Sequence, residues 1–150
     1  MAQSLSKIVV HVVFSTKNHK PFLSTAVRNN LFAYITGILN SLDCRTLDIN
    51  GTEDHVHVLV MMAKTISLSK MLQDIKGGSS RWLNSQAVKA RPFAWQSGYG
   101  AFSVSESQIV KVVDYIAGQE EHHRKTTFQE ELILLLKKHK IEFDEQHLWT

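Results

Sequence analysis

The sequence has little cysteine and no long apolar run, and both absences narrow the class of protein. Cys44 is the only cysteine, so a disulfide framework and a metal cluster held by thiolates are excluded. No apolar stretch reaches the length of a transmembrane helix, and residues 1–7 lack the charged and then apolar layout of a secretory signal. We therefore expect a cytoplasmic protein with no membrane partner.

Internal repeats, low-complexity tracts and interdomain linkers are also absent, which favours a single domain over residues 1–150. Hydrophobic residues make up 43% of the chain and charged residues 21%, a balance typical of a globular protein with a real core. The formal net charge of +3 permits a polyanionic partner without requiring one.

Hydrophobic patterning predicts strands alternating with helices. β-Branched residues predict four strands, at residues 7–15, 45–50 and 55–62 and near 102–104. Ser24 and Ser67 are good N-caps for two intervening helices, and the second contains the poorly helical pair Gly77-Gly78. The resulting order β-α-β-β-α-β predicts an α+β, ferredoxin-like fold with an antiparallel sheet.

Two added helices are expected after the last strand. Ser105 and Gln108 have the spacing of a capping box, which predicts a helix over residues 106–123. Thr127 and Glu130 have the same spacing, which predicts a tail helix over residues 130–138.

The first added helix carries two polar residues at the edge of its apolar stripe. Tyr115 and Gln119 are four residues apart, so they lie one above the other on successive turns. The stripe itself packs onto the sheet. These two side chains therefore border the buried seam between the helix and the sheet.

His55 and His57 stand on either side of Val56 in the strand predicted at 55–62. Side chains at i and i+2 of a strand point to the same face, so the two imidazoles lie side by side. Neutral imidazoles at this spacing are suited to form half of a divalent-metal site. The alternative is two half-exposed strand histidines that bind nothing.

Tyr115 and Gln119 would turn the histidine pair into a site for phosphodiester chemistry. Gln119 would add an oxygen ligand to a metal held by the histidines, and Tyr115 would be the nucleophile. A divalent ion bound to a phosphate oxygen withdraws charge and fixes the phosphorus for in-line attack, and either Mg²⁺ or Mn²⁺ suits such ligands. The alternatives are a boundary tyrosine with a wet hydroxyl and a solvated glutamine.

Ordered motifs extend over nearly the whole chain, at residues 12–17, 54–57, 76–80, 95–104 and 115–123. Together they resemble the single-tyrosine HUH transposases, which are the insertion-sequence 200/605 type and its relatives associated with repetitive extragenic palindromes. The resemblance implies that His55, His57 and Gln119 bind the metal. It also implies that Tyr115 attacks single-stranded DNA, leaving a 5′-phosphotyrosine and a free 3′-hydroxyl.

The resemblance implies partners as well. The family works as a homodimer, commonly with the tyrosine helix of one subunit reaching the histidine pair of the other, and its substrates are imperfect DNA hairpins near element ends. Basic residues are then candidates for phosphate contacts: Lys17, Lys20, Lys70, Lys76 and Arg81. Trp95 and Tyr99 would either stack on unpaired bases or pack in the core.

Two other functions are compatible with the sequence. A domesticated or inactive relative would bind hairpins through the same fold without cutting them. An HUH nickase of replication initiation usually carries a second tyrosine or extra domains, for which 150 residues leave little room. The spacing assigns no role to His122 and His123, and it reveals no general base for Tyr115.

Overall fold

The computed structural model describes residues 2–86 and 92–149. At its centre is an antiparallel sheet with the strand order β2-β3-β1-β4. The strands are β1 (Val9–Ser15), β2 (Arg45–Gly51), β3 (His55–Met61) and β4 (Gly100–Val104). The order of strands and helices along the chain confirms the predicted ferredoxin-like α+β fold.

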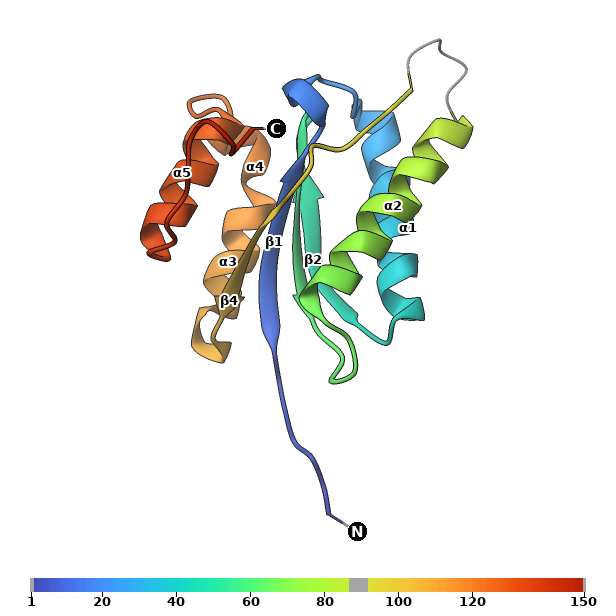
Figure 1. The fold of residues 1–150 in the computed structure, drawn as a ribbon, viewed down its shortest axis with the longest axis vertical. Helices are drawn as coiled ribbons and strands as arrows, with labels where there is room; N and C mark the ends of the chain where they lie inside the picture. The colour runs from blue at the N-terminus through green and yellow to red at the C-terminus, as the bar shows by residue number, and fades with distance from the viewer. Residues whose placement is uncertain (1, 87–91, 150) are drawn as a thin grey trace.

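Helices cover both faces of the sheet (Figure 1). One face carries α1 (Thr25–Ser41) and α2 (Leu68–Gln86), and the other carries α3 (Ile109–Ala117), α4 (Gln119–His122) and α5 (Phe128–Lys138). None of the helices in the described part of the chain has the length and apolarity needed to span a bilayer.

Alternation along the central strands β1 and β3 divides their side chains between the two faces. Val12 and Val58 are paired residues of β1 and β3, and both pack in the core beneath α1 and α2. Their neighbours point to the opposite face, where Val13 lies across from His57. The histidine pair therefore faces the layer of α3, α4 and α5, and this layer is what encloses the site.

The first two helices begin and pack as their sequences predict. The Ser24 hydroxyl accepts a hydrogen bond from the Val27 N–H, and the Ser67 hydroxyl accepts one from the Lys70 N–H. Gly78 has a packing reason for its place in α2, because a Cβ there would lie 2.8 Å from Cδ1 of Ile38 on α1. The glycine lets the two helices approach closely.

The single helix predicted over residues 106–123 is wrong. The chain instead forms a short 3₁₀ turn, η2 (Glu106–Gln108), and then α3 and α4, which are separated at Gly118. Ser105 makes no side-chain cap, because its hydroxyl lies 3.2 Å from the Ser107 hydroxyl. Gly118, a poor helix former with φ −88° and ψ 16°, allows the break that separates α3 from α4.

The capping box predicted at Thr127 is confirmed. The Thr127 hydroxyl accepts a hydrogen bond from the Glu130 N–H at 3.2 Å, and the Glu130 carboxylate accepts one from the Thr127 N–H at 3.4 Å. The helix begins at Phe128, two residues before the predicted start. This places Phe128 in the buried layer beside the sheet.

Candidate active site

His55 and His57 are both completely buried, with 0% of their surface exposed. They project from β3 towards the layer of α3, α4 and α5 with their ring centroids 5.1 Å apart. Nε2 of His55 lies 3.1 Å from Oε1 of Gln119, and Nε2 of His57 lies 3.0 Å from Oε1 of Glu131. The alternative of two half-exposed histidines therefore does not hold.

The Nδ1 atom of His55 has two hydrogen-bond partners. It lies 2.8 Å from Oδ1 of Asp54 and 2.9 Å from the Thr52 hydroxyl. Because a carboxylate oxygen only accepts, Nδ1 of His55 donates to Asp54, and Nε2 is the ring atom that faces Gln119. An outer partner of this kind is what commonly orients a metal-binding histidine.

The Nδ1 atom of His57 has a different partner, His11 of β1, whose Nε2 lies 2.8 Å away. Burial and the neighbouring His57 lower the pKa of His11 to about 3, and burial lowers that of His57 to about 4. Both rings are therefore neutral near pH 7. The sequence pattern gave no sign of this role for His11.

Removing His11 should destabilise the protein. We expect His11→Leu to lower the free energy of unfolding by about 1–3 kcal/mol, because it leaves the buried Nδ1 of His57 without a partner. Urea denaturation followed by circular dichroism measures the change. His11→Gln, which keeps a polar group, should lose less, and a His11→Leu variant as stable as the wild type would contradict this role.

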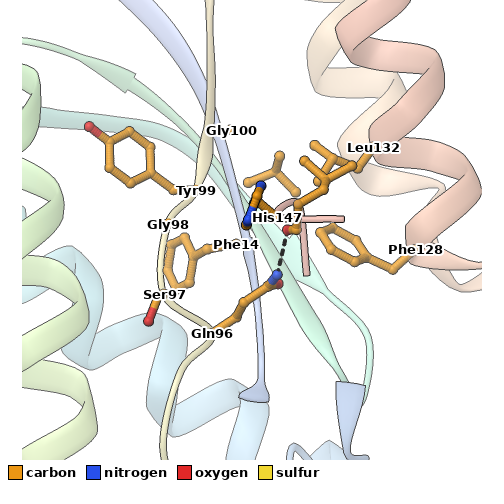
Figure 2. A pocket seen from close by; sticks show the side chains of 11 residues that line it. Phe14, Gln96, Ser97, Gly98, Tyr99, Gly100, Phe128, Leu132 and His147 are labelled. Carbon is orange, nitrogen blue, oxygen red and sulfur yellow. Dashed lines mark hydrogen bonds between the residues drawn. The ribbon is translucent and has the colours of Figure 1, made fainter. Parts of the chain in front are cut away.

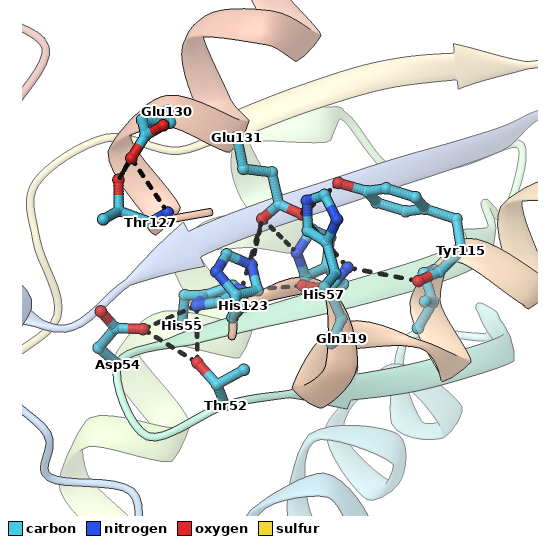
Figure 3. Close-up of polar contacts among 12 residues, drawn as sticks. Thr52, Asp54, His55, His57, Tyr115, Gln119, His123, Thr127, Glu130 and Glu131 are labelled. Atoms are coloured by element: carbon cyan, nitrogen blue, oxygen red, sulfur yellow. Dashed lines mark hydrogen bonds and ion pairs between the residues drawn. The ribbon is translucent and has the colours of Figure 1, made fainter. Parts of the chain in front are cut away.

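Glu131, which was not predicted from the sequence, lies at the centre of the site (Figure 3). Its side chain is 1% exposed. Oε1 lies 3.0 Å from Nε2 of His57 and 3.1 Å from Nε2 of His123. Oε2 accepts hydrogen bonds from the Tyr115 hydroxyl and from Nε2 of Gln119, the latter at 3.2 Å. One carboxylate therefore joins β3, α3 and α4 to α5.

A signal for Glu131 was present in the sequence. It stands in the apolar stripe of α5, three residues after Phe128 and one before Leu132, and both of these are buried. A charged residue on the buried face of an amphipathic helix is rare unless it is paired. The pattern could not show which side chains pair with Glu131.

Glu131 is ionised in this site. Burial by itself would raise the pKa of its carboxyl, but hydrogen bonds from His123 and His57 outweigh that effect and hold the pKa far below its usual range. Burial would lower the pKa of His123, yet its bond to Glu131 leaves that pKa above the usual value. The site therefore combines one buried anion, the neutral ring of His57 and the ring of His123, whose protonated form the anion favours.

Tyr115 and Gln119 both reach the histidine pair, as predicted. Gln119 has 0% of its surface exposed, so it is not a solvated helix residue. The Tyr115 ring stands edge-on to the His57 ring with centroids 5.9 Å apart. Burial and the adjacent Glu131 raise the pKa of Tyr115 well above its usual value.

The histidines that the sequence left without a role also lie at this site. The ring of His123 lies 4.3 Å from that of His55, centroid to centroid, and His122 lies beside Tyr115, with centroids 5.5 Å apart. Nε2 of His122 is 3.4 Å from Oε2 of Glu131. His122 and His123 therefore both lie next to Glu131.

The donor atoms fit a divalent cation. One ligand atom from each of His55, His57, His123 and Glu131 lies within 4.8 Å of the others, and Oε1 of Gln119 borders the same group. Mixed imidazole nitrogen and carboxyl or amide oxygen suits Mn²⁺ well and is compatible with Mg²⁺. The charge of Glu131 would be offset by such an ion.

Four of the five basic residues predicted to contact DNA are exposed: Lys17, Lys20, Lys70 and Arg81. Lys70 forms an ion pair with Asp74 at 2.9 Å, one turn further along α2. An exposed pair of this kind is weak and is easily exchanged for a phosphate. These side chains are therefore accessible to a nucleic acid.

Lys76 is placed differently. Its ammonium group donates a hydrogen bond to the Gln96 carbonyl at 2.7 Å and another to the Gly98 carbonyl. Burial lowers the pKa of Lys76 to about 8. In this structure Lys76 holds the segment that leads into β4, and a phosphate would have to compete with two carbonyls for it.

That segment borders a cavity of about 160 Å³ between β1 and α5 (Figure 2). Tyr99, 43% exposed, lines it. Gln96 donates a hydrogen bond from Nε2 to the Leu148 carbonyl at 2.7 Å and so ties the segment to the C-terminal residues. Trp95 instead packs in the core and donates to the Ser79 hydroxyl. Of the two aromatic residues, only Tyr99 is open to a base.

The chain matches the model of a known protein family. A family model described as IS200-like transposase matches residues 4–119, a range that contains His55, His57, Tyr115 and Gln119. No curated protein matches the chain.

Two solved structures share the fold. One is a transposase candidate from Deinococcus radiodurans R1, with a TM-score of 0.62 and 20% identity over 79% of this chain and 98% of that one. The other is a REP-associated tyrosine transposase bound to a REP hairpin, with a TM-score of 0.62 and 14% identity over 82% of this chain and 74% of that one. Because the family match covers most of the chain, this protein belongs to the IS200-like transposases.

Proposed function

We propose that this transposase cleaves and rejoins single-stranded DNA through Tyr115, with a divalent cation held by His55, His57 and Gln119. One observation carries the proposal. The Tyr115 hydroxyl and Nε2 of His57 meet on the two oxygens of the same buried carboxylate, Glu131, within one chain. A nucleophile and a metal-binding pair are thus brought to one point.

The chemistry follows from these positions. The Tyr115 oxygen attacks the phosphorus, a bond from tyrosine to phosphorus forms, and the bond to the 3′ oxygen breaks. Oε2 of Glu131 accepts the hydrogen bond of the hydroxyl and so orients it, while the tyrosine proton passes to solvent and the 3′ oxygen gains a proton from solvent. A bound divalent ion would supply the Lewis acid that draws charge from the phosphate.

The products explain how strands are rejoined. The reaction leaves a 5′-phosphotyrosine on the protein and a free 3′-hydroxyl on the DNA. Because the phosphodiester is replaced by another phosphodiester, attack by a 3′-hydroxyl can reverse the step without ATP. Cleavage and transfer therefore use the same residues.

Hairpin DNA is the proposed substrate class. The REP-associated relative with this fold is bound to a REP hairpin, and the exposed Lys17, Lys20, Lys70 and Arg81 offer phosphate contacts. Tyr99 is the proposed stacking surface for an unpaired base. We also propose that the protein is a homodimer, with Tyr115 acting on the histidine pair of its own chain, since the two are adjacent there.

A covalent adduct tests the proposed function. Hairpin-bearing single-stranded DNA is incubated with the protein and Mn²⁺ and run on a denaturing gel. DNA labelled at its 3′ end should migrate with the protein, whereas DNA labelled at its 5′ end should appear as a shorter free product. EDTA should abolish both signals.

Gels also distinguish the proposed function from the alternative, a module that binds hairpins without cutting them. Retarded hairpin DNA on a native gel, with no adduct for any of a panel of hairpins with Mn²⁺ or Mg²⁺, would indicate a binding module that does not cut. An adduct carrying the 5′ label would mean that the opposite bond is broken. Either result would contradict the proposal.

A further inference from the structure

We propose that Glu131 is itself a ligand of the divalent cation, so that α5 supplies an anionic ligand to the histidine pair. This inference rests on the proposed function, since it concerns the same ion. Glu131 lies beyond residues 4–119, the range that the family model matches.

The position of one oxygen carries the inference. Oε1 of Glu131 lies 3.0 Å from Nε2 of His57 and 3.5 Å from Nε2 of His55. Ligand atoms at right angles around an ion, with bonds of about 2.1 Å, lie about 3.0 Å apart. The separations are therefore close to those of neighbouring ligands on one ion. Gln119 contacts only His55 of the pair.

The buried charge of Glu131 supports the same inference. Among the described residues, the groups within ion-pair distance of Glu131 are all imidazoles: His55, His57, His122 and His123. Burying a carboxylate costs several kcal/mol unless a positive charge offsets it. Hard divalent ions prefer carboxylate oxygen among protein ligands. A cation beside Oε1 would balance the charge where it is buried.

The fold fixes the carboxylate in place. Phe128, the first residue of α5, packs its ring on His55 with centroids 4.7 Å apart, and Leu132 and Leu136 belong to the same buried cluster as Val13 of β1. His123 holds Oε1 from the other side at 3.1 Å. A ligand that is rigidly placed loses little freedom when the ion binds.

The competing explanation is that Glu131 serves only as the counter-ion of His123. Binding of Mn²⁺ to the full-length protein without DNA, measured by isothermal titration calorimetry, separates the two. We expect Glu131→Gln to weaken Mn²⁺ binding on the order of 100-fold or more, because the anionic oxygen is lost. Glu121→Gln is the matched control, since it removes an exposed carboxylate from α4 and should leave the affinity unchanged.

A second variant guards against a folding defect. Glu131→Asp keeps the charge on a shorter side chain and should bind Mn²⁺ with an affinity between those of the wild type and Glu131→Gln. Thermal unfolding of each variant without metal shows whether the fold is kept. In addition, the visible spectrum of bound Co²⁺ should change in Glu131→Gln if a ligand has been replaced.

The outcomes distinguish this inference from the proposed function. Wild-type Mn²⁺ affinity in Glu131→Gln, together with lost affinity in His57→Ala, would overturn the inference and leave the tyrosine chemistry intact. A wild-type protein that binds no Mn²⁺ would also overturn it. Conversely, lost affinity in Glu131→Gln with no DNA adduct in the wild type would support the ligand and refute the proposed function.

Discussion

Replacement of Tyr115 by phenylalanine is expected to abolish the covalent adduct with DNA while hairpin binding is kept. The change removes the one oxygen that would attack phosphorus. The ring, which stands edge-on to His57, stays in place. The loss should reach background, on the order of 10⁴-fold or more, as for other catalytic nucleophiles. The measurement is the 3′-labelled adduct on a denaturing gel.

Tyr34→Phe is the control for this variant. Tyr34 is a partly exposed tyrosine of α1, on the opposite side of the sheet, and its hydroxyl should not matter for cleavage. Hairpin affinity in a native gel should be the same for both variants. A persistent adduct in Tyr115→Phe would show that another group is the nucleophile.

The second large effect is expected for His57→Ala. The variant loses a metal ligand, leaves His11 without its bond to His57 and removes one of the hydrogen bonds to Glu131. Cleavage should fall to background, whereas hairpin binding, which we assign to exposed residues outside β3, should stay within a few-fold of the wild type. His139→Ala, which removes an exposed histidine after α5, should cleave normally.

Mixing the two inactive variants tests whether Tyr115 and the histidine pair act within one chain. If Tyr115 acts on the histidine pair of its own chain, a mixture of Tyr115→Phe and His57→Ala contains no complete site and stays inactive. Restored adduct in the mixture would show that a dimer joins the tyrosine of one subunit to the histidines of the other. Loss of hairpin binding together with cleavage in His57→Ala would instead indicate a structural role for His57.

Local patterns predicted the sheet and half of the site. The β-branched runs located the strands, and the i, i+2 rule placed His55 and His57 on one face. The stripe on the following helix brought Tyr115 and Gln119 to the same layer. These inferences needed only the geometry of a strand and of a helix.

The other half of the site depends on contacts distant in the sequence. The capping box at Thr127 shows where α5 begins, but nothing in it shows that the helix docks on β3 and aims Glu131 at His57. His11 was missed for the same reason. It lies in a strand of β-branched residues, and its partner His57 is distant in the sequence. The break at Gly118 was missed because one glycine in a helical pattern is ordinarily tolerated.

The hydrogen bonds that run from His11 through His57 and Glu131 to Tyr115 have a mechanical consequence. They connect, in one line, the central strand of the sheet, its neighbour, the last helix and the helix of the nucleophile. A displacement of any one of these four elements changes the bonds of the next. The reactive hydroxyl is therefore connected, through the side chains of Glu131, His57 and His11, to an inner strand of the sheet.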